Sequence, residues 1–156
     1  MSSQSHNKIT TLTISYSLDF RNPENFFHDV ASVASLLKLF FRDLPDPLFT
    51  HAAYHAFINA ARSENPTERR DALHQQINDL PDPNYATLRT LVLHLHRVMQ
   101  YEGKNRMGRQ QLAICWAPTL MVGAGTSGVG GMQDTGLMVR VVETILGCAT
   151  AIFDED

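Results

Sequence analysis

Apolar residues recur at three- and four-residue steps through most of the chain, which is the spacing of amphipathic helices. The first clear stretch follows Asn22 and Pro23, which suit a helix N-cap and a first helical position. Residues 44–47 (LPDP) are predicted to end this helix, because proline cannot continue it and constrains the residue before it. The predicted core-facing stripe consists of Val30, Val33, Ala34, Leu37, Phe40 and Phe41.

Four further helices are predicted between this one and a glycine-rich stretch, with Thr50, Asn65, Asp82 and Asn105 as their N-caps. Gly103 is the expected C-cap of the third of these four. The fourth is expected to run to about Trp116, since Pro118 follows. Residues 123–131 are predicted to form a flexible loop, and a final helix is predicted from about Thr135.

Six predicted helices and no convincing strand indicate an all-α helical bundle. Residues 1–20 are interpreted as an irregular N-terminal segment, and residues 21–156 as the domain. The 156 residues are enough for one domain with a real core, and the 44% hydrophobic and 19% charged residues are ordinary for a globular protein.

Charge and cysteine content narrow the class of protein further. The net charge of −3 gives no general electrostatic reason to bind nucleic acid or an anionic membrane. No apolar run approaches the roughly 20 residues that span a bilayer, and the polar N-terminus does not resemble a secretory signal, so membrane insertion is not expected. Cys115 and Cys148 make no disulfide framework, which favours a reducing compartment and a cytoplasmic protein.

Patterns typical of enzyme or metal sites are weak. The glycine-rich residues 123–131 lack the lysine and the preceding strand of a phosphate-binding loop, and a surface linker is the better interpretation. His51 and His55 lie four apart, but the zinc-protease glutamate is missing between them. Neither a metal, nor a cofactor, nor a self-contained catalytic pair is expected.

Lys38 and Arg42 form a sharper feature. They are four residues apart, so both cations should lie on one ridge of the first helix, beside its apolar stripe. On spacing alone, a solvated edge that keeps the protein soluble is the more common explanation.

The sequence around this pair resembles the central signature of RhoGAP domains, a leucine-rich helix with a fixed Lys and Arg followed by Leu-Pro-x-Pro-Leu. The matching residues are 36–48 (LLKLFFRDLPDPL). Further blocks resemble the family at residues 83–85 (PNY), at residues 105–107 (NRM) together with 118–120 (PTL), and at residues 141–146 (VVETIL). The resemblance runs from about Asn22 to Phe153.

This resemblance implies a GTPase-activating domain that binds the GTP-bound form of a Rho-family small GTPase, with GTP and Mg²⁺ belonging to that partner. Family members insert an arginine that is worth roughly 10³- to 10⁵-fold in hydrolysis rate. Lys38 and Arg42 match positions that face the GTPase. Asn105 matches the asparagine that opens the next interface helix, Gln111 stands where the family usually has asparagine, and Pro118 matches a proline that shapes the helix end.

One departure bears on catalysis. The catalytic arginine of the family lies in a Gly-x-[Phe/Tyr]-Arg-x-Ser-Gly segment, and this motif does not occur in the chain. Arg21 is the only arginine before Lys38, and its context differs from the motif. The expectation is therefore an N-terminally truncated RhoGAP bundle that lacks the N-terminal helices and exposes part of an apolar face.

Several functions stay open at this point. The chain is either a GTPase activator or a catalytically inactive GTPase-binding or scaffolding module. A helical scaffold unrelated to GTPases is a third alternative. RhoGAP domains commonly sit in larger regulators, so flanking domains are a further expectation.

Overall fold

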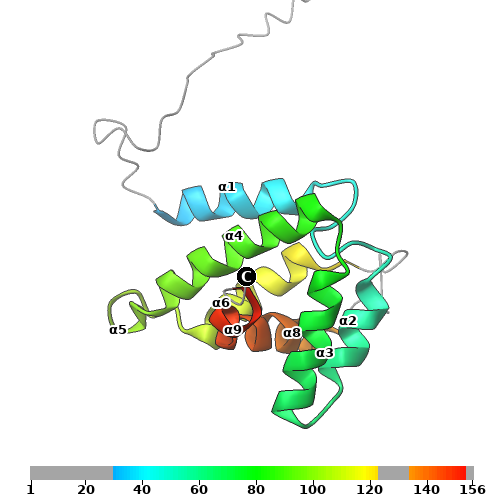
Figure 1. The fold of residues 1–156 in the computed structure, drawn as a ribbon. Coiled ribbons are helices and arrows are strands. Elements are labelled where there is room, and N and C mark those ends of the chain that lie inside the picture. Colours follow the sequence, from blue (N-terminus) through cyan, green and yellow to red (C-terminus); the bar gives the residue numbers. More distant parts are fainter. Residues whose placement is uncertain (1–29, 123–133, 154–156) are drawn as a thin grey trace, which may run out of the picture.

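The computed structural model describes residues 30–122 and 134–153, and every regular element in these ranges is a helix (Figure 1). The predicted all-α fold class is therefore confirmed. The helix assigned to start at Asn22 begins at Val30 among the described residues, while Asn22 itself, residues 1–20 and residues 123–131 lie outside them. The elements are α1 (Val30–Arg42), α2 (Tyr54–Ala61), α3 (Pro66–Asn78), α4 (Asp82–Met99), α5 (Glu102–Asn105), α6 (Arg109–Leu120), α8 (Thr135–Gly147) and α9 (Ala149–Phe153).

The helices α6 and α8 pack most extensively and form the centre of the bundle. The α2–α3 hairpin and α4 pack against α8, while α1 lies along α6 on the other side (Figure 1). Buried apolar side chains from all of these helices meet in one core. Among the largest of them are Phe49, Phe57, Leu73, Leu88, Ile145 and Phe153.

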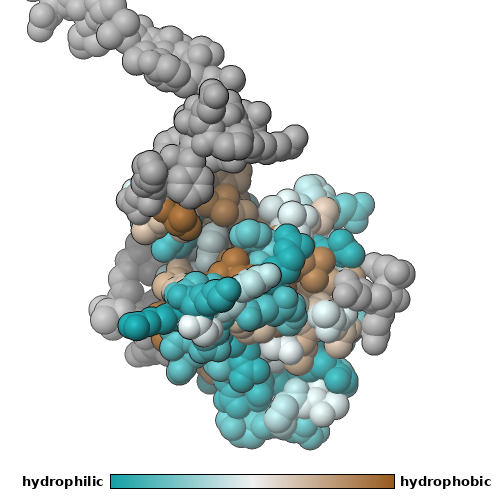
Figure 2. Space-filling view, turned by 90° about the vertical axis from the view of Figure 1, so that its left-hand side faces the viewer, coloured by the Kyte–Doolittle hydropathy of each residue, from teal (hydrophilic) through white to brown (hydrophobic). Residues whose placement is uncertain are grey.

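The helix α1 buries much less than its apolar pattern predicts. Phe41 is its one buried residue, whereas Leu37 and Phe40 of the predicted core-facing stripe are 40% and 61% exposed. Leu36 and Leu39 are also exposed. The reason is that α1 contacts α6 along one edge, so the rest of its broad stripe faces outward among the described residues. In Figure 2, brown apolar side chains appear in the upper part of the molecule, where Figure 1 places α1.

The predicted helix starts are partly wrong. Asn65 is the N-cap of α3 as predicted, since its Oδ1 accepts hydrogen bonds from the backbone N–H groups of Thr67 (2.9 Å) and Glu68 (3.4 Å). Thr50 does not cap α2: its Oγ1 accepts from the Ala53 N–H at 3.1 Å, in the turn before that helix. Asp82 is the first residue of α4, and Pro81 occupies the N-cap position.

The connection from α4 to α6 differs from the prediction in a similar way. The helix α4 ends at Met99, and Gly103 lies within the short α5, so Gly103 is not a C-cap. The left-handed residue that follows α5 is Arg106, with φ of 57°. Gly108, and not Asn105, is the N-cap of α6.

The predicted end of α6 is also wrong. This helix continues through Pro118 to Leu120, although it was expected to stop near Trp116. A proline inside a helix deprives the carbonyl four residues earlier of its N–H partner. That residue is Ile114, which is 54% exposed, so water can satisfy its carbonyl. The final predicted helix is divided at Cys148 into α8 and α9.

Tyr54 makes the stability of the fold depend on pH in the alkaline range. It is 2% exposed, its hydroxyl donates to Asp134 Oδ2 at 3.1 Å, and burial with this contact raises the pKa of Tyr54 to about 12. The folded pKa lies above the unfolded value, so the stabilisation is complete below about pH 10 and is lost as the pH rises towards 12. We expect a loss of about 2–3 kcal/mol over this window, measured by urea unfolding. Tyr54→Phe should lose this component of the pH dependence, and an unchanged profile would contradict the assignment.

Candidate functional site

The helix α1 carries the predicted basic pair. Lys38 and Arg42 lie one helical turn apart, with Lys38 half-buried and Arg42 exposed at the last position of the helix. The negative end of the helix dipole favours a cation at that position. Within the described residues, no hydrogen bond or ion pair holds either side chain, so both cations are free to meet an anionic partner.

The helix α6 presents a narrow exposed face. Gln111, Ile114, Cys115 and Pro118 recur at steps of three, one and three residues, and all four are exposed. The opposite face is buried against the bundle and includes Leu112, Ala113, Trp116, Ala117 and Leu120. We call the four exposed residues the α6 face. Gln111 offers an amide, while Ile114 and Pro118 offer apolar surface.

Sequence analysis missed Ile114 and Cys115 as members of this face. The signal was present in their spacing relative to Gln111 and Pro118. It was hidden because the helix was expected to end before Pro118, which would have taken Pro118 off the ridge.

An aromatic contact brings the basic pair and the α6 face together. The rings of Phe41 and Trp116 meet edge to face, with centroids 6.1 Å apart, and both residues are 5% exposed. At the end of the following loop, the backbone N–H of Phe49 donates to the carbonyl of Leu120 at 3.3 Å. The C-terminal ends of α1 and α6 are therefore held close to each other.

Asn105 lies apart from this junction, before the N-terminus of α6. Its Nδ2 donates to the carbonyl of Val98 at 2.8 Å, and its Oδ1 accepts from the N–H of Met107 at 2.8 Å. Arg109, the first residue of α6, and Pro118 are nine residues apart, which is roughly 13–14 Å along the helix axis, and Asn105 precedes the start of that helix. The side chain of Asn105 thus braces the α4–α6 connection, and its amide is already used within the chain.

An apolar groove of about 440 Å³ separates α1 from α4. Leu37, Phe41, Leu91 and His94 are among its lining residues. No acid–base pair lines it, so it offers packing surface and no chemistry of its own. Among the described residues there is also no group of three or more metal-ligating side chains, and no described helix has the length and apolar character to cross a membrane.

The RhoGAP domain family matches residues 2–123. The chain belongs to the RhoGAP domain family. The match begins at residue 2 and so includes residues before the signature helix. It also includes α1, α5 and α6, the three helices that carry the predicted site residues.

Two curated relatives match most of the chain. The chain is 38% identical over 139 residues to "Probable Rho-GTPase-activating protein 7" of Schizosaccharomyces pombe, which covers 89% of the chain and 19% of that protein. It is 37% identical over 122 residues to N-chimaerin of Rattus norvegicus, covering 78% of the chain and 36% of that protein. The chain thus spans a fifth to about a third of the length of these relatives.

Solved structures agree with this assignment. The BH domain from Graf, the GTPase regulator associated with focal adhesion kinase, superposes with a TM-score of 0.75 at 28% identity, covering 85% of the chain and 72% of that structure. Human Rho GTPase activating protein 15 superposes with a TM-score of 0.78 at 28% identity, covering 88% of the chain and 64% of that structure. The arrangement of helices in this RhoGAP chain is therefore that of its family.

Proposed function

We propose that this RhoGAP chain docks on the GTP-bound form of a Rho-family small GTPase through α1 and α6, and that docking promotes GTP hydrolysis by the partner. The observation that supports the proposal is the Phe41–Trp116 contact, because it holds α1, which carries the basic pair, against α6 in a chain of this family. The GTP and the Mg²⁺ needed for hydrolysis belong to the partner.

The proposed contacts divide by chemistry. Lys38 and Arg42 meet acidic or phosphate-proximal groups of the GTPase, and Gln111 hydrogen-bonds near its switch segments. Ile114 and Pro118 supply apolar contact between these polar groups, as the core of an interface usually does. Asn105 acts indirectly, because its hydrogen bonds to Val98 and Met107 fix where α6 begins.

A binding-only function is the alternative, supported by the lack of the arginine-finger motif in the residues of this chain. Fixed guanidinium groups accelerate phosphoryl transfer because they stabilise charge that develops in the transition state. Lys38 and Arg42 can recognise the partner without providing this group. Binding and acceleration must therefore be measured separately.

We expect the chain to bind a Rho-family GTPase loaded with a non-hydrolysable GTP analogue more tightly than the GDP form, and Ile114→Asp to weaken this binding at least tenfold, since it buries a charge at the interface. Isothermal titration calorimetry measures both affinities. Single-turnover GTP hydrolysis by the same GTPase then separates an activator from a binding-only module. Ile114 is 54% exposed, so its variant should keep the helical circular dichroism spectrum of the unmodified chain. Equal affinity for the two nucleotide states would contradict docking on the GTP form.

A further inference from the structure

A second pocket lies where α3, α6 and α8 meet, away from the α6 face. Its volume is about 230 Å³. Pockets for drug-sized ligands hold roughly 300–1,000 Å³, so this one suits a small group. Arg69 of α3, Arg109 of α6 and Arg140 of α8 all line it.

The charge around this pocket is opposite in sign to that of the whole protein. Three arginines and one carboxylate, Glu143, line it, while the chain carries a net charge of −3. Guanidinium groups are planar forks of N–H donors that match the oxygens of phosphate and carboxylate groups. A local excess of such donors therefore favours an oxyanion with more than one negative charge.

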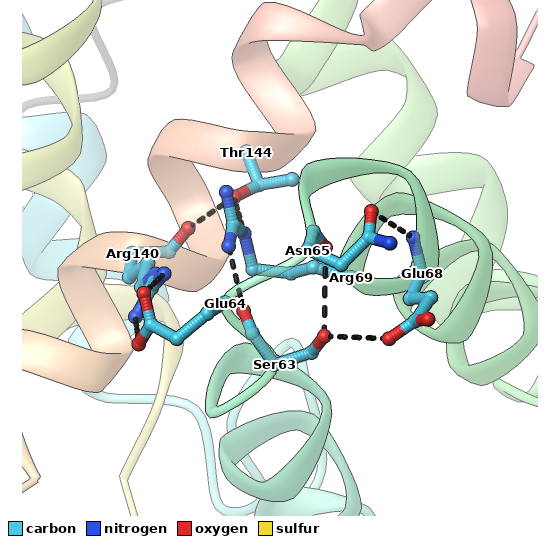
Figure 3. A network of polar contacts seen from close by, with 7 residues as sticks. All are labelled: Ser63, Glu64, Asn65, Glu68, Arg69, Arg140 and Thr144. Carbon is cyan, nitrogen blue, oxygen red and sulfur yellow. Dashed lines mark hydrogen bonds and ion pairs between the residues drawn. The ribbon is translucent and has the colours of Figure 1, made fainter.

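The chain fixes Arg69 in place. Its Nε donates to Thr144 Oγ1 at 3.1 Å, and its Nη1 donates to the carbonyl of Ser63 at 2.7 Å. Figure 3 shows this side chain reaching from α3 to α8 between these two acceptors. Both contacts are to neutral oxygens, so neither hydrogen bond neutralises the positive charge of Arg69, although the nearby Glu64 carboxylate interacts with it through space.

Arg140 is paired, but on the solvent side. Both of its terminal nitrogens bond Glu64, each at 3.0 Å, and this contact lowers the pKa of the Glu64 carboxyl (Figure 3). The Glu64 side chain is 87% exposed and does not line the pocket. Because Glu64 is exposed to water and salt, its attraction to Arg140 is screened, and a multiply charged anion can compete with it for Arg140.

Arg109 is the most available of the three arginines. Within the part of the chain that the structure describes, its one contact to a charged group is Glu143, with 3.6 Å between Nε and Oε1. Its guanidinium lies over Gly147: a Cβ at Gly147 would be 2.7 Å from Arg109 Nη1. The missing side chain at Gly147 thus gives Arg109 its position at the pocket.

We propose that this pocket binds a phosphate monoester dianion, held by Arg69, Arg109 and Arg140. Phosphate offers enough oxygens for several guanidinium forks, and its charge offsets the excess of cations that line the pocket. Glu143 faces Arg109 and acts as the competitor that the ligand displaces. The site is separate from the α6 face, because Arg109 and Gln111 are two residues apart on α6 and point in different directions.

The test is a titration of the full chain with phosphoserine at constant ionic strength, followed by the NMR resonances of the arginine Nε–H groups. We expect saturable shifts at Arg69 and Arg109 with a dissociation constant of about 1 mM or lower. Arg109→Ala should weaken binding at least about tenfold, since it removes a charge-assisted hydrogen bond. Inorganic phosphate and vesicles that carry a monophosphorylated lipid, used as parallel probes, show whether a small soluble monoester or a membrane headgroup binds more tightly.

Two further variants distinguish the effect of the position of the Arg109 guanidinium from the effect of the overall positive charge. Gly147→Ala keeps every charge but displaces the Arg109 guanidinium, so it should also weaken binding. Arg97→Ala removes one positive charge from the exposed side of α4, outside the pocket, and should leave the affinity unchanged. If Arg97→Ala and Arg109→Ala reduce the affinity equally, or if no probe gives saturable shifts at these arginines, the pocket is not an anion site.

Discussion

Replacing both Lys38 and Arg42 by alanine is expected to weaken binding to a GTP-loaded Rho-family GTPase by about 100-fold or more. A hydrogen bond to a charged group contributes about 1.5–3 kcal/mol, so two lost contacts correspond to at least two factors of ten. Neither side chain is held by another described residue, and Arg42 is exposed, so stability should change little. Calorimetric titration measures the affinity, and urea unfolding checks the fold.

The matched control is Arg70→Ala with Arg97→Ala. It removes the same charge from α3 and α4, outside α1 and the α6 face. Long-range attraction depends on net charge and weakens with salt, whereas a direct contact depends on position. The control should therefore retain nearly full affinity at physiological ionic strength. Equal losses in the two double variants would mean that Lys38 and Arg42 act through overall charge, and the proposed docking surface would then be wrong.

The sequence predicted the helical class and the basic pair because both depend on local spacing. Lys38 and Arg42 share a side of α1 wherever that helix packs, since a four-residue step is a property of the helix itself. Burial is different, because it depends on which neighbours arrive. Leu37 and Phe40 belong to the same apolar stripe as Phe41, yet Phe41 alone is buried, because α6 meets only one edge of α1.

The α6 face was hidden by a local rule that tertiary structure overrides. Proline usually ends a helix, but Pro118 lies near the end of α6, where the carbonyl that it leaves unpaired belongs to the exposed Ile114. Asn105 is a case in which a suitable residue type does not take the predicted role. Its side chain could cap a helix, but the chain uses it to bond Val98 and Met107, and only three-dimensional contacts reveal that choice.

Trp116 links the packing of the core to the position of α1. Its ring is buried between α1 and the rest of the bundle and meets Phe41 edge to face, so one residue of α6 anchors the helix that carries Lys38 and Arg42. An aromatic pair of this geometry is worth about 0.5–1.5 kcal/mol beyond the area that it buries. The position of α1, and with it the proposed docking surface, therefore depends on this contact.

Trp116→Ala is accordingly expected to have the largest effect on stability, lowering the free energy of unfolding by about 3–5 kcal/mol. This loss is large, since the free energy of unfolding of a domain is only about 5–15 kcal/mol in total. The variant should also bind the GTPase more weakly, because α1 loses its contact with the Trp116 ring. Urea unfolding must be followed by circular dichroism, as Trp116 is the only tryptophan. Tyr101→Ala removes an aromatic ring that is 62% exposed and should cost about 0.5 kcal/mol or less, and Trp116→Phe should recover part of both losses. Full GTPase affinity in folded Trp116→Ala would show that α1 is positioned by other contacts.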